Sequence, residues 1–179
     1  MSKVFTSAGT ELAVTTSKPA TEDETGYEAL TYTPVSEVTN LGEYGPEYEV
    51  VTHNSVPERR TDKLKGAVND GTMSLQLGRV LSGVGQTILS EGADGAEVDT
   101  IHAFRVTLQD GTKQYFRGQI FSFTTNAGSV NQITGGSVTI ELETEIIAST
   151  PSTPAPAPSF VYTASRDNTA RKLDSGGNE

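Results

Sequence analysis

Residues 104–117 read FRVTLQDGTKQYFR and make the strongest local prediction in the chain. An Asp-Gly pair can adopt the positive φ values that a tight type I′ turn requires at its two central positions. The runs on either side, 104–108 and 113–117, are strand-like in composition. We therefore expect Asp110 and Gly111 to close a hairpin between these two runs.

A third strand is expected downstream, in the segment that ends at Ile147. Apolar side chains recur on one face at Val138, Ile140, Leu142 and Ile146, and Thr139 starts the opposite face. That opposite face continues with Glu141, Glu143 and Glu145. This acidic row is either an outer face turned to solvent or a surface that is kept anionic.

Upstream of the hairpin, residues 72–77 alternate cleanly, with Met73, Leu75 and Leu77 on one face, and predict a half-buried strand. Residues 80–91 then change period and predict one short amphipathic helix that ends near Gly92. Its apolar face would consist of Leu81, Val84 and Ile88, docked on a sheet.

The N-terminal third predicts a strand at 10–14, a polar loop at 15–31 and a second hairpin. This hairpin would join 35–41 to 47–52 through a turn with two glycines and a proline at 42–46. The loop contains Glu22-Asp23-Glu24, which is either a solvated acidic stretch or a weak cation site.

Periodicity disappears over residues 53–71, which predicts a long loop. The loop concentrates cations at Arg59, Arg60, Lys63 and Lys65 in an otherwise acidic chain. One interpretation is a solvated basic loop. The other is that these cations meet the acidic surface of another copy, which gives contacts that close into rings or extend into filaments.

The domain prediction is one β domain at 1–149, followed by a proline-rich linker at 150–158 and a short tail at 159–179. Alternating prolines cannot pair in a sheet and favour an extended conformation. The tail contains too few apolar side chains to fold alone, so we expect it to be disordered or laid along a neighbour.

Composition narrows the function classes. The net charge of −10 and the pI of 4.6 disfavour stable binding of nucleic acid. Cysteine is absent, so neither disulfides nor cysteine-ligated metals are expected. No secretory leader or membrane span is expected either, and we predict a soluble protein made in the cytoplasm. A hydrophobic fraction of 34% without tryptophan favours a thin β architecture.

Enzymatic chemistry and bound cofactors are not expected. His53 and His102 are the only histidines, and neither lies in a nucleophile or metal motif. His102 alternates with apolar residues and is predicted to be a core or interface residue. The three glutamates share one environment, so they lack the pKa contrast that paired catalytic carboxylates need.

Six short motifs occur in the order known from one protein family, in a resemblance that extends over residues 8–147. They are Ala8-Gly9-Thr10-Glu11-Leu12, Val38-Thr39-Asn40-Leu41, Asp70-Gly71-Thr72-Met73-Ser74-Leu75, Leu108-Gln109-Asp110-Gly111, Phe116-Arg117-Gly118 and Val138-Thr139-Ile140. With them the chain resembles the tail tube protein, or major tail protein, of long flexible-tailed bacteriophages of the lambda type.

The resemblance implies a mainly β fold, a β-sandwich or partial barrel with one short flanking helix. It implies hexameric rings in which strands of all subunits close a continuous inner β-barrel, which removes exposed sheet edges. Stacked rings would form the virion tail tube, through which the viral double-stranded DNA is ejected without stable binding. The implied partners are further copies, the tape measure protein, and the tail terminator and tail tip proteins.

The resemblance also implies assembly contacts, and electrostatics suggests residues for the bore. The loop at 53–71 would contact neighbouring subunits and rings through its four cations. A carboxylate-rich bore would let DNA slide, because cations exposed there would bind phosphate. The predicted bore residues are Glu141, Glu143 and Glu145, with Glu47 and Glu49 behind them.

Two alternatives have different partners. One is a ring-forming tube protein of a contractile injection or secretion apparatus, which would lack a DNA cargo. The other is a virion or cell-surface carbohydrate-binding module, which would need an exposed aromatic platform from Tyr27, Tyr32, Tyr44 and Tyr48.

Overall fold

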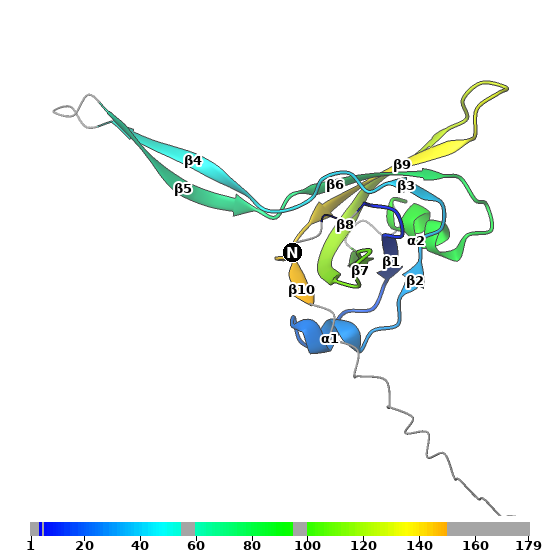
Figure 1. Ribbon diagram of the computed structural model, residues 1–179, viewed down its shortest axis with the longest axis horizontal. Helices are drawn as coiled ribbons and strands as arrows, with labels where there is room; N and C mark the ends of the chain where they lie inside the picture. The colour runs from blue at the N-terminus through cyan, green and yellow to red at the C-terminus, as the bar shows by residue number, and fades with distance from the viewer. Residues whose placement is uncertain (1–3, 5, 55–59, 95–99, 150–179) are drawn as a thin grey trace, which may run out of the picture.

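The computed structural model describes residues 4, 6–54, 60–94 and 100–149. Strands make up far more of these residues than helices do (Figure 1). The strands are β1 (Glu11–Thr15), β2 (Thr33–Pro34), β3 (Val38–Asn40), β4 (Glu47–Asn54), β5 (Thr61–Asn69), β6 (Thr72–Gly78), β7 (Ile101–Thr107), β8 (Lys113–Asn126), β9 (Gly135–Leu142) and β10 (Ile147–Ser149). The helices are α1 (Glu24–Glu28) and α2 (Val84–Gly92). Neither helix is long and apolar enough to cross a membrane, and these are the helices of the described residues.

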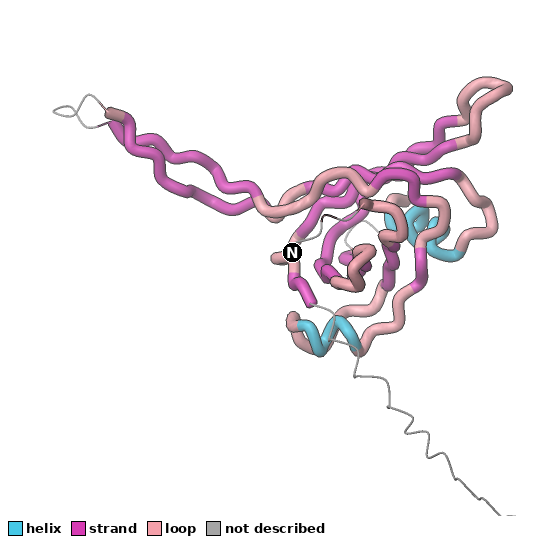
Figure 2. Tube along the Cα trace, viewed as in Figure 1, coloured by secondary structure: helices cyan, strands magenta, loops and turns pink. Residues whose placement is uncertain are grey.

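Eight strands form one antiparallel sheet that curls into a half-barrel (Figure 2). Its path is β2-β1-β7-β8-β9-β6-β3, and β10 pairs with the start of β8. Strand β8 joins the two halves of the sheet, because its first part pairs with β7 and its second part with β9. A β-bulge at Phe121 interrupts the β8–β9 register and increases the local bend. The predicted mainly β fold is confirmed.

The core lies inside this curl and is closed on one side by α2. Phe104 and Phe116 stack at its centre with ring centroids 5.4 Å apart. The predicted half-buried strand at 72–77 is confirmed, since β6 alternates between exposed and buried residues along its length. The buried core cluster includes Leu12, Val14, Met73, Leu75, Leu77, Leu89, Phe104, Val106, Phe116, Val138, Ile140 and Leu142.

The β7–β8 hairpin is confirmed, but its turn is not of type I′. The Gly111 N–H donates to the Leu108 carbonyl at 2.9 Å, and the Leu108 N–H donates to the Thr112 carbonyl at 2.8 Å. Gly111 has a φ of 86°, whereas among the described residues Glu37 is the one non-glycine with positive φ. Asp110 therefore keeps a negative φ, and the loop is a three-residue turn that ends in a glycine bulge.

The predicted hairpin between 35–41 and 47–52 is wrong. Strand β3 pairs with β6 of the main sheet, whereas β4 pairs with β5. Residues 53–71 are also not one long loop, since β4 ends at Asn54 and residues 61–69 form β5. The Gly45-Pro46 segment is the point where the chain leaves the main sheet. Figure 1 shows β4 and β5 projecting from the body as a two-stranded ribbon, which we call the arm.

Helix α2 is shorter than predicted and faces the core differently. Leu81 precedes the helix and is 89% exposed, and Val84 is 66% exposed. The buried face consists of Gly85, Gln86 and Leu89 together with Gly92, and Ile88 packs at its margin. A side chain at position 85 would collide with the carbonyl of Pro34, so glycine permits the close approach of helix and strand.

The predicted loop at 15–31 contains α1. Asp23 caps this helix, because its side chain accepts a hydrogen bond from the Gly26 N–H at 2.8 Å. Tyr27 of α1 is fully buried and stacks on Tyr115 of β8 at 5.5 Å. The helix therefore covers the side of β7 and β8 that faces away from the main core.

His102 is 2% exposed, which confirms the prediction of a core position, and its Nδ1 lies 3.1 Å from the Thr100 carbonyl. The predicted linker at 150–158, the tail at 159–179 and Arg59 lie outside the described residues.

Candidate assembly surfaces

The solvent-facing side of strands β6, β9 and β8 is a continuous polar surface, which we call the polar face. Buried residues such as Leu75 point from these strands into the core, so the residues between them point outward. The register aligns these outward residues in three rows of three across the strands. The rows are Thr72, Glu141 and Gln119; Ser74, Thr139 and Ser122; and Gln76, Ser137 and Thr124.

The nine positions of the polar face carry a single ionisable group, the carboxylate of Glu141, and no cation. The Thr72 hydroxyl donates a hydrogen bond of 2.6 Å to this carboxylate. All nine side chains are exposed or half-buried. The polar face therefore presents hydroxyl and amide groups with one fixed negative charge.

The sheet that carries the polar face has open margins on two sides. Among the described strands, none pairs with the outer side of β3. On the other side, β7 follows β8 only as far as Gln119, so no described strand pairs with that side of residues 120–126. Phe121 lies at this second margin and is 64% exposed. Unpaired backbone groups and an exposed aromatic ring are features of a sheet that another chain extends.

The arm has no buried face within the subunit. Every residue of β4 is exposed, and so are all residues of β5 except the half-buried Gly66. Val50, Leu64 and Val68 expose 63%, 61% and 52% of their surface. A lone two-stranded ribbon is marginally stable in water. The arm therefore has the character of a segment that is covered on assembly.

The structure does not bring the five predicted bore residues together. Glu141 lies on the polar face, but β9 ends at Leu142, so Glu143 and Glu145 belong to the exposed connection to β10. Glu47 and Glu49 lie on β4 at the root of the arm. The expected period of two across 138–146 thus fails after Leu142. The Glu143 N–H still donates to the Arg117 carbonyl at 2.9 Å, but the Arg117 N–H donates to the Thr144 side chain at 2.9 Å, so the regular β8–β9 ladder ends here.

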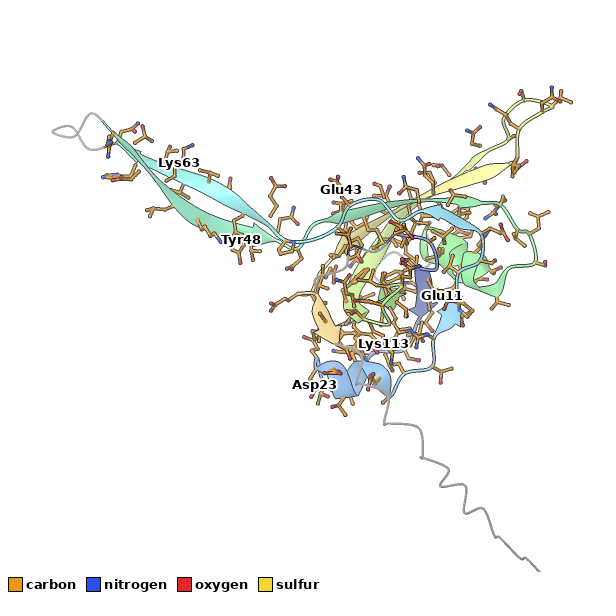
Figure 3. All side chains as sticks on the ribbon, viewed as in Figure 1. Glu11, Asp23, Glu43, Tyr48, Lys63 and Lys113 are labelled. Carbon is orange, nitrogen blue, oxygen red and sulfur yellow. The ribbon has the colours of Figure 1, made fainter. Side chains whose placement is uncertain are left out.

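The three predicted contact cations that the structure describes fall on or beside the arm. Lys63 and Lys65 belong to β5, and Arg60 lies immediately before it. Figure 3 shows Lys63 and Tyr48 on the arm, well away from Lys113 and Asp23 near α1. The sequence analysis identified residues 53–71 as the basic segment, but it predicted a loop where Lys63 and Lys65 lie on a strand.

The acidic triplet at the start of α1, Glu22-Asp23-Glu24, takes part in local hydrogen bonds and an ion pair. Glu22 pairs with Arg117 at 2.8 Å, and the Ser149 hydroxyl donates to Glu24 at 2.5 Å. The Thr21 hydroxyl, and then the Gly26 N–H, lower the pKa of Asp23 by hydrogen bonding. On the same side, the hydrogen bond from Lys113 lowers the pKa of Glu28. These interactions fasten α1 to β8 and β10.

The four tyrosines that a carbohydrate platform would require do not form one. Tyr27 of α1 is buried against Tyr115, and Tyr32 is half-buried beside the same ring with centroids 6.2 Å apart. Burial raises the pKa of Tyr32. Tyr44 packs against the core ring of Phe116. Of the four, only Tyr48 on the arm is exposed, at 46%.

Comparison with known proteins finds likeness at the level of structure. No family model and no curated protein sequence matches the chain. A chain in the six-fold-symmetrised cryo-EM structure of the anti-feeding prophage baseplate superposes with a TM-score of 0.64 at 14% identity, over 84% of this chain and 98% of that chain.

Two further cryo-EM structures give the same type of match. A chain of the sheath/tube terminator of the extracellular contractile injection system PVC has a TM-score of 0.54 at 12% identity, over 83% of this chain and 98% of that chain. A chain of the PVC sheath–tube complex has a TM-score of 0.51 at 12% identity, over 79% of this chain and 88% of that chain. The protein thus has a fold found in the tubes and baseplates of phage-like contractile particles.

Proposed function

We propose that the protein is a structural subunit of a phage tail-like tube. Copies would join edge to edge into rings, the rings would stack, and the polar face would line the bore. The observation that carries this proposal is the combination of a cation-free polar face with open sheet margins on both sides. The fold shared with tube and baseplate components supports it.

The open margins suit ring closure. The β3 margin of one copy and the β8 margin of the next are different surfaces, so their contact is heterologous. Contacts of this type close into a ring when the rotation between copies divides a full turn. A closed barrel pairs every inner strand and removes the free edges. We propose six copies per ring, in keeping with the resemblance and with the six-fold symmetry of one neighbour's particle.

The chemistry of the polar face suits a passage. A surface of hydroxyl and amide groups with one carboxylate per copy has no cation to hold a phosphate backbone. A negatively charged polymer would pass such a wall without lasting contacts. This is a structural role, and we propose no catalytic activity.

Two settings fit this role and differ in their cargo. In a long-tailed phage the tube would conduct double-stranded DNA at ejection, and its ends would meet the tape measure, terminator and tip proteins. In a contractile injection apparatus the same ring would form an inner tube without a DNA cargo. The structural neighbours come from contractile particles. They support the contractile setting at least as well as the setting of a long-tailed phage.

Electron microscopy of the purified, concentrated protein tests the proposal. Negative-stain images should show rings or tubes with a central channel, and their number should rise with protein concentration. A protein that sediments as a monomer at all concentrations and shows no particles would overturn the proposal. If tubes form, particles copurified from the native source distinguish the two settings. DNA-filled particles would indicate a long-tailed phage, and sheathed particles would indicate a contractile apparatus.

A further inference from the structure

The two faces of the arm differ in charge. Residues directly opposed in an antiparallel pair lie on the same face, and the face alternates along each strand. Val50 is opposite Lys65, and Thr52 is opposite Lys63, so these four residues share one face. Tyr48 belongs to the same face by alternation, and the Lys65 ammonium lies 4.3 Å from its ring centroid. We call this the basic face of the arm.

The other face carries the acids. Val51 is opposite Leu64, and His53 is opposite Asp62. Glu49 alternates with Val51 and His53, and a Cβ at Gly66 would touch both the Val51 methyl group and the Glu49 Cβ. This contact independently places Glu49 and Val51 on one side of the ribbon. We call this side the acidic face.

Each face has the composition of one half of an interface. The basic face surrounds the exposed apolar groups of Tyr48 and Val50 with ammonium groups. The acidic face surrounds Val51 and Leu64, which expose 47% and 61% of their surface, with carboxylates. An apolar centre with a charged rim is the usual anatomy of a protein interface. Neither face is covered within the subunit.

From this charge complementarity we infer that the basic face of one arm docks on the acidic face of the arm of a second copy. This inference rests on the proposed function, because it assumes that copies assemble. Each arm then has one partner on each face, and the contact is heterologous like that of the sheet margins. Opposite charges fix which face meets which, and the apolar centres supply the buried area.

Two competing arrangements make different predictions. In the first, arms pair edge to edge. Both charged faces then stay uncovered, so charge reversal on them would not change assembly. In the second, the basic face docks on another acidic surface, such as the Glu141 region of a neighbour. Lysines on a lone ribbon also hinder edge pairing, which disfavours the first arrangement.

Paired charge reversals distinguish these arrangements. One variant, Lys63→Glu with Lys65→Glu, has two acidic faces. The other, Glu49→Lys with Asp62→Lys, has two basic faces. Each variant alone should need about tenfold or more protein for half-maximal assembly than the wild type, a change equivalent to about 1.4 kcal/mol. The second variant is the sharper test, since it lowers the net negative charge and so weakens general repulsion between copies.

An equimolar mixture of the two variants should assemble at nearly the wild-type concentration, because acidic and basic arms can alternate. The quadruple variant, with its faces exchanged, should do the same. A mixture that stays unassembled would overturn the inference in favour of a different acidic partner. Normal assembly of each variant alone would overturn it in favour of edge pairing.

Two controls keep the inference separate from the proposed function. Lys18→Glu makes half the charge change of the double Lys63→Glu, Lys65→Glu variant, at an exposed position far along the sequence from the arm, and should assemble normally. Circular dichroism should show that all variants remain folded, since the arm contributes nothing to the core. If the wild type itself fails to assemble, the proposed function fails, whereas a failure confined to the mixture rejects the arm contact alone.

Discussion

Thr72 and Glu141 face each other directly across the β6–β9 pair, and the Thr72 hydroxyl holds the Glu141 carboxylate with a hydrogen bond of 2.6 Å. This bond fixes the one charge of the polar face at its end, beside the root of the arm. Glu143, two residues later, has already left the strand. Glu141 is therefore held within the polar face, whereas Glu143 lies beyond the end of β9 in the exposed connection to β10.

Replacing Glu141 with lysine should convert the polar face from a non-binding to a DNA-binding surface. Assembled Glu141→Lys tubes should retain short double-stranded DNA at low salt and release it as salt rises, because phosphate contacts release counterions. Cosedimentation of labelled DNA with tubes measures this. Glu143→Lys is the matched control and should retain no DNA, and equal retention by both variants would contradict the assignment of the polar face.

Gln86 should be the most sensitive polar residue of the core. It is 1% exposed, its Nε2 donates to the carbonyls of Ser36 and Gly78, and its Oε1 accepts from the Val80 N–H. Gln86→Leu keeps the volume but leaves three backbone groups unpaired, so it should lower the free energy of unfolding by about 3 kcal/mol. Denaturant unfolding measures the loss.

The exposed Gln109 provides the control for this experiment. Gln109→Leu should change the free energy of unfolding by less than about 0.5 kcal/mol. If Gln86→Leu were as mild as this control, the amide would not be the link between α2 and the ends of β2 and β6.

Gly85→Ala should destabilise the protein although alanine favours helices. Alanine gains about 1 kcal/mol of helix propensity over glycine, but its Cβ would meet the carbonyl of Pro34. The backbone must then shift, and we expect a net loss of about 1–3 kcal/mol in the free energy of unfolding. Thr87→Ala, on the exposed side of α2, should stay within about 0.5 kcal/mol. A stabilised Gly85→Ala variant would show that the helix does not approach β2 closely.

The cap of α1 should contribute an acid-sensitive part of the stability. Hydrogen bonds from Thr21 and Gly26 lower the pKa of Asp23 below its ordinary value of 3.8. The folded state thus binds the proton less readily than the unfolded state. The contribution is complete above pH 3.8 and is lost as the pH falls through the lower, folded-state pKa.

Asp23→Asn tests this pH dependence, because asparagine can still cap the helix but does not titrate. The melting temperature of the wild type should fall more steeply below pH 3.8 than that of the variant, while the two profiles run parallel near pH 7. Parallel profiles through the acid range would contradict the role of the Asp23 carboxylate.

The strands that could be predicted are those with one face buried in the subunit. In β6, Met73, Leu75 and Leu77 alternate with polar residues because every second side chain packs into the core. The Asp110-Gly111 pair predicted the β7–β8 hairpin. The part of the polar face that lies on β6 could be predicted for the same reason. Thr72, Ser74 and Gln76 alternate with the buried residues and must point to the opposite side of the sheet.

The arm could not be recognised because nothing within the subunit covers it. Val50 and Val51 are adjacent and lie on opposite faces, so both faces carry apolar groups and no alternation results. The face of α2 was missed for a different reason. Its buried residues include Gly85 and Gln86, which serve close approach and hydrogen bonding rather than hydrophobic burial.

Cysteine labelling measures most directly whether the polar face lines the bore. The sequence contains no native cysteine, so only the introduced thiol reacts. Ser74→Cys, on the polar face, and Ser17→Cys, at an exposed site outside it, should both react rapidly with a bulky polymer-linked maleimide as monomers. In assembled tubes we predict that Ser74→Cys is protected while Ser17→Cys still reacts. Rapid labelling of Ser74→Cys in intact tubes would contradict the account.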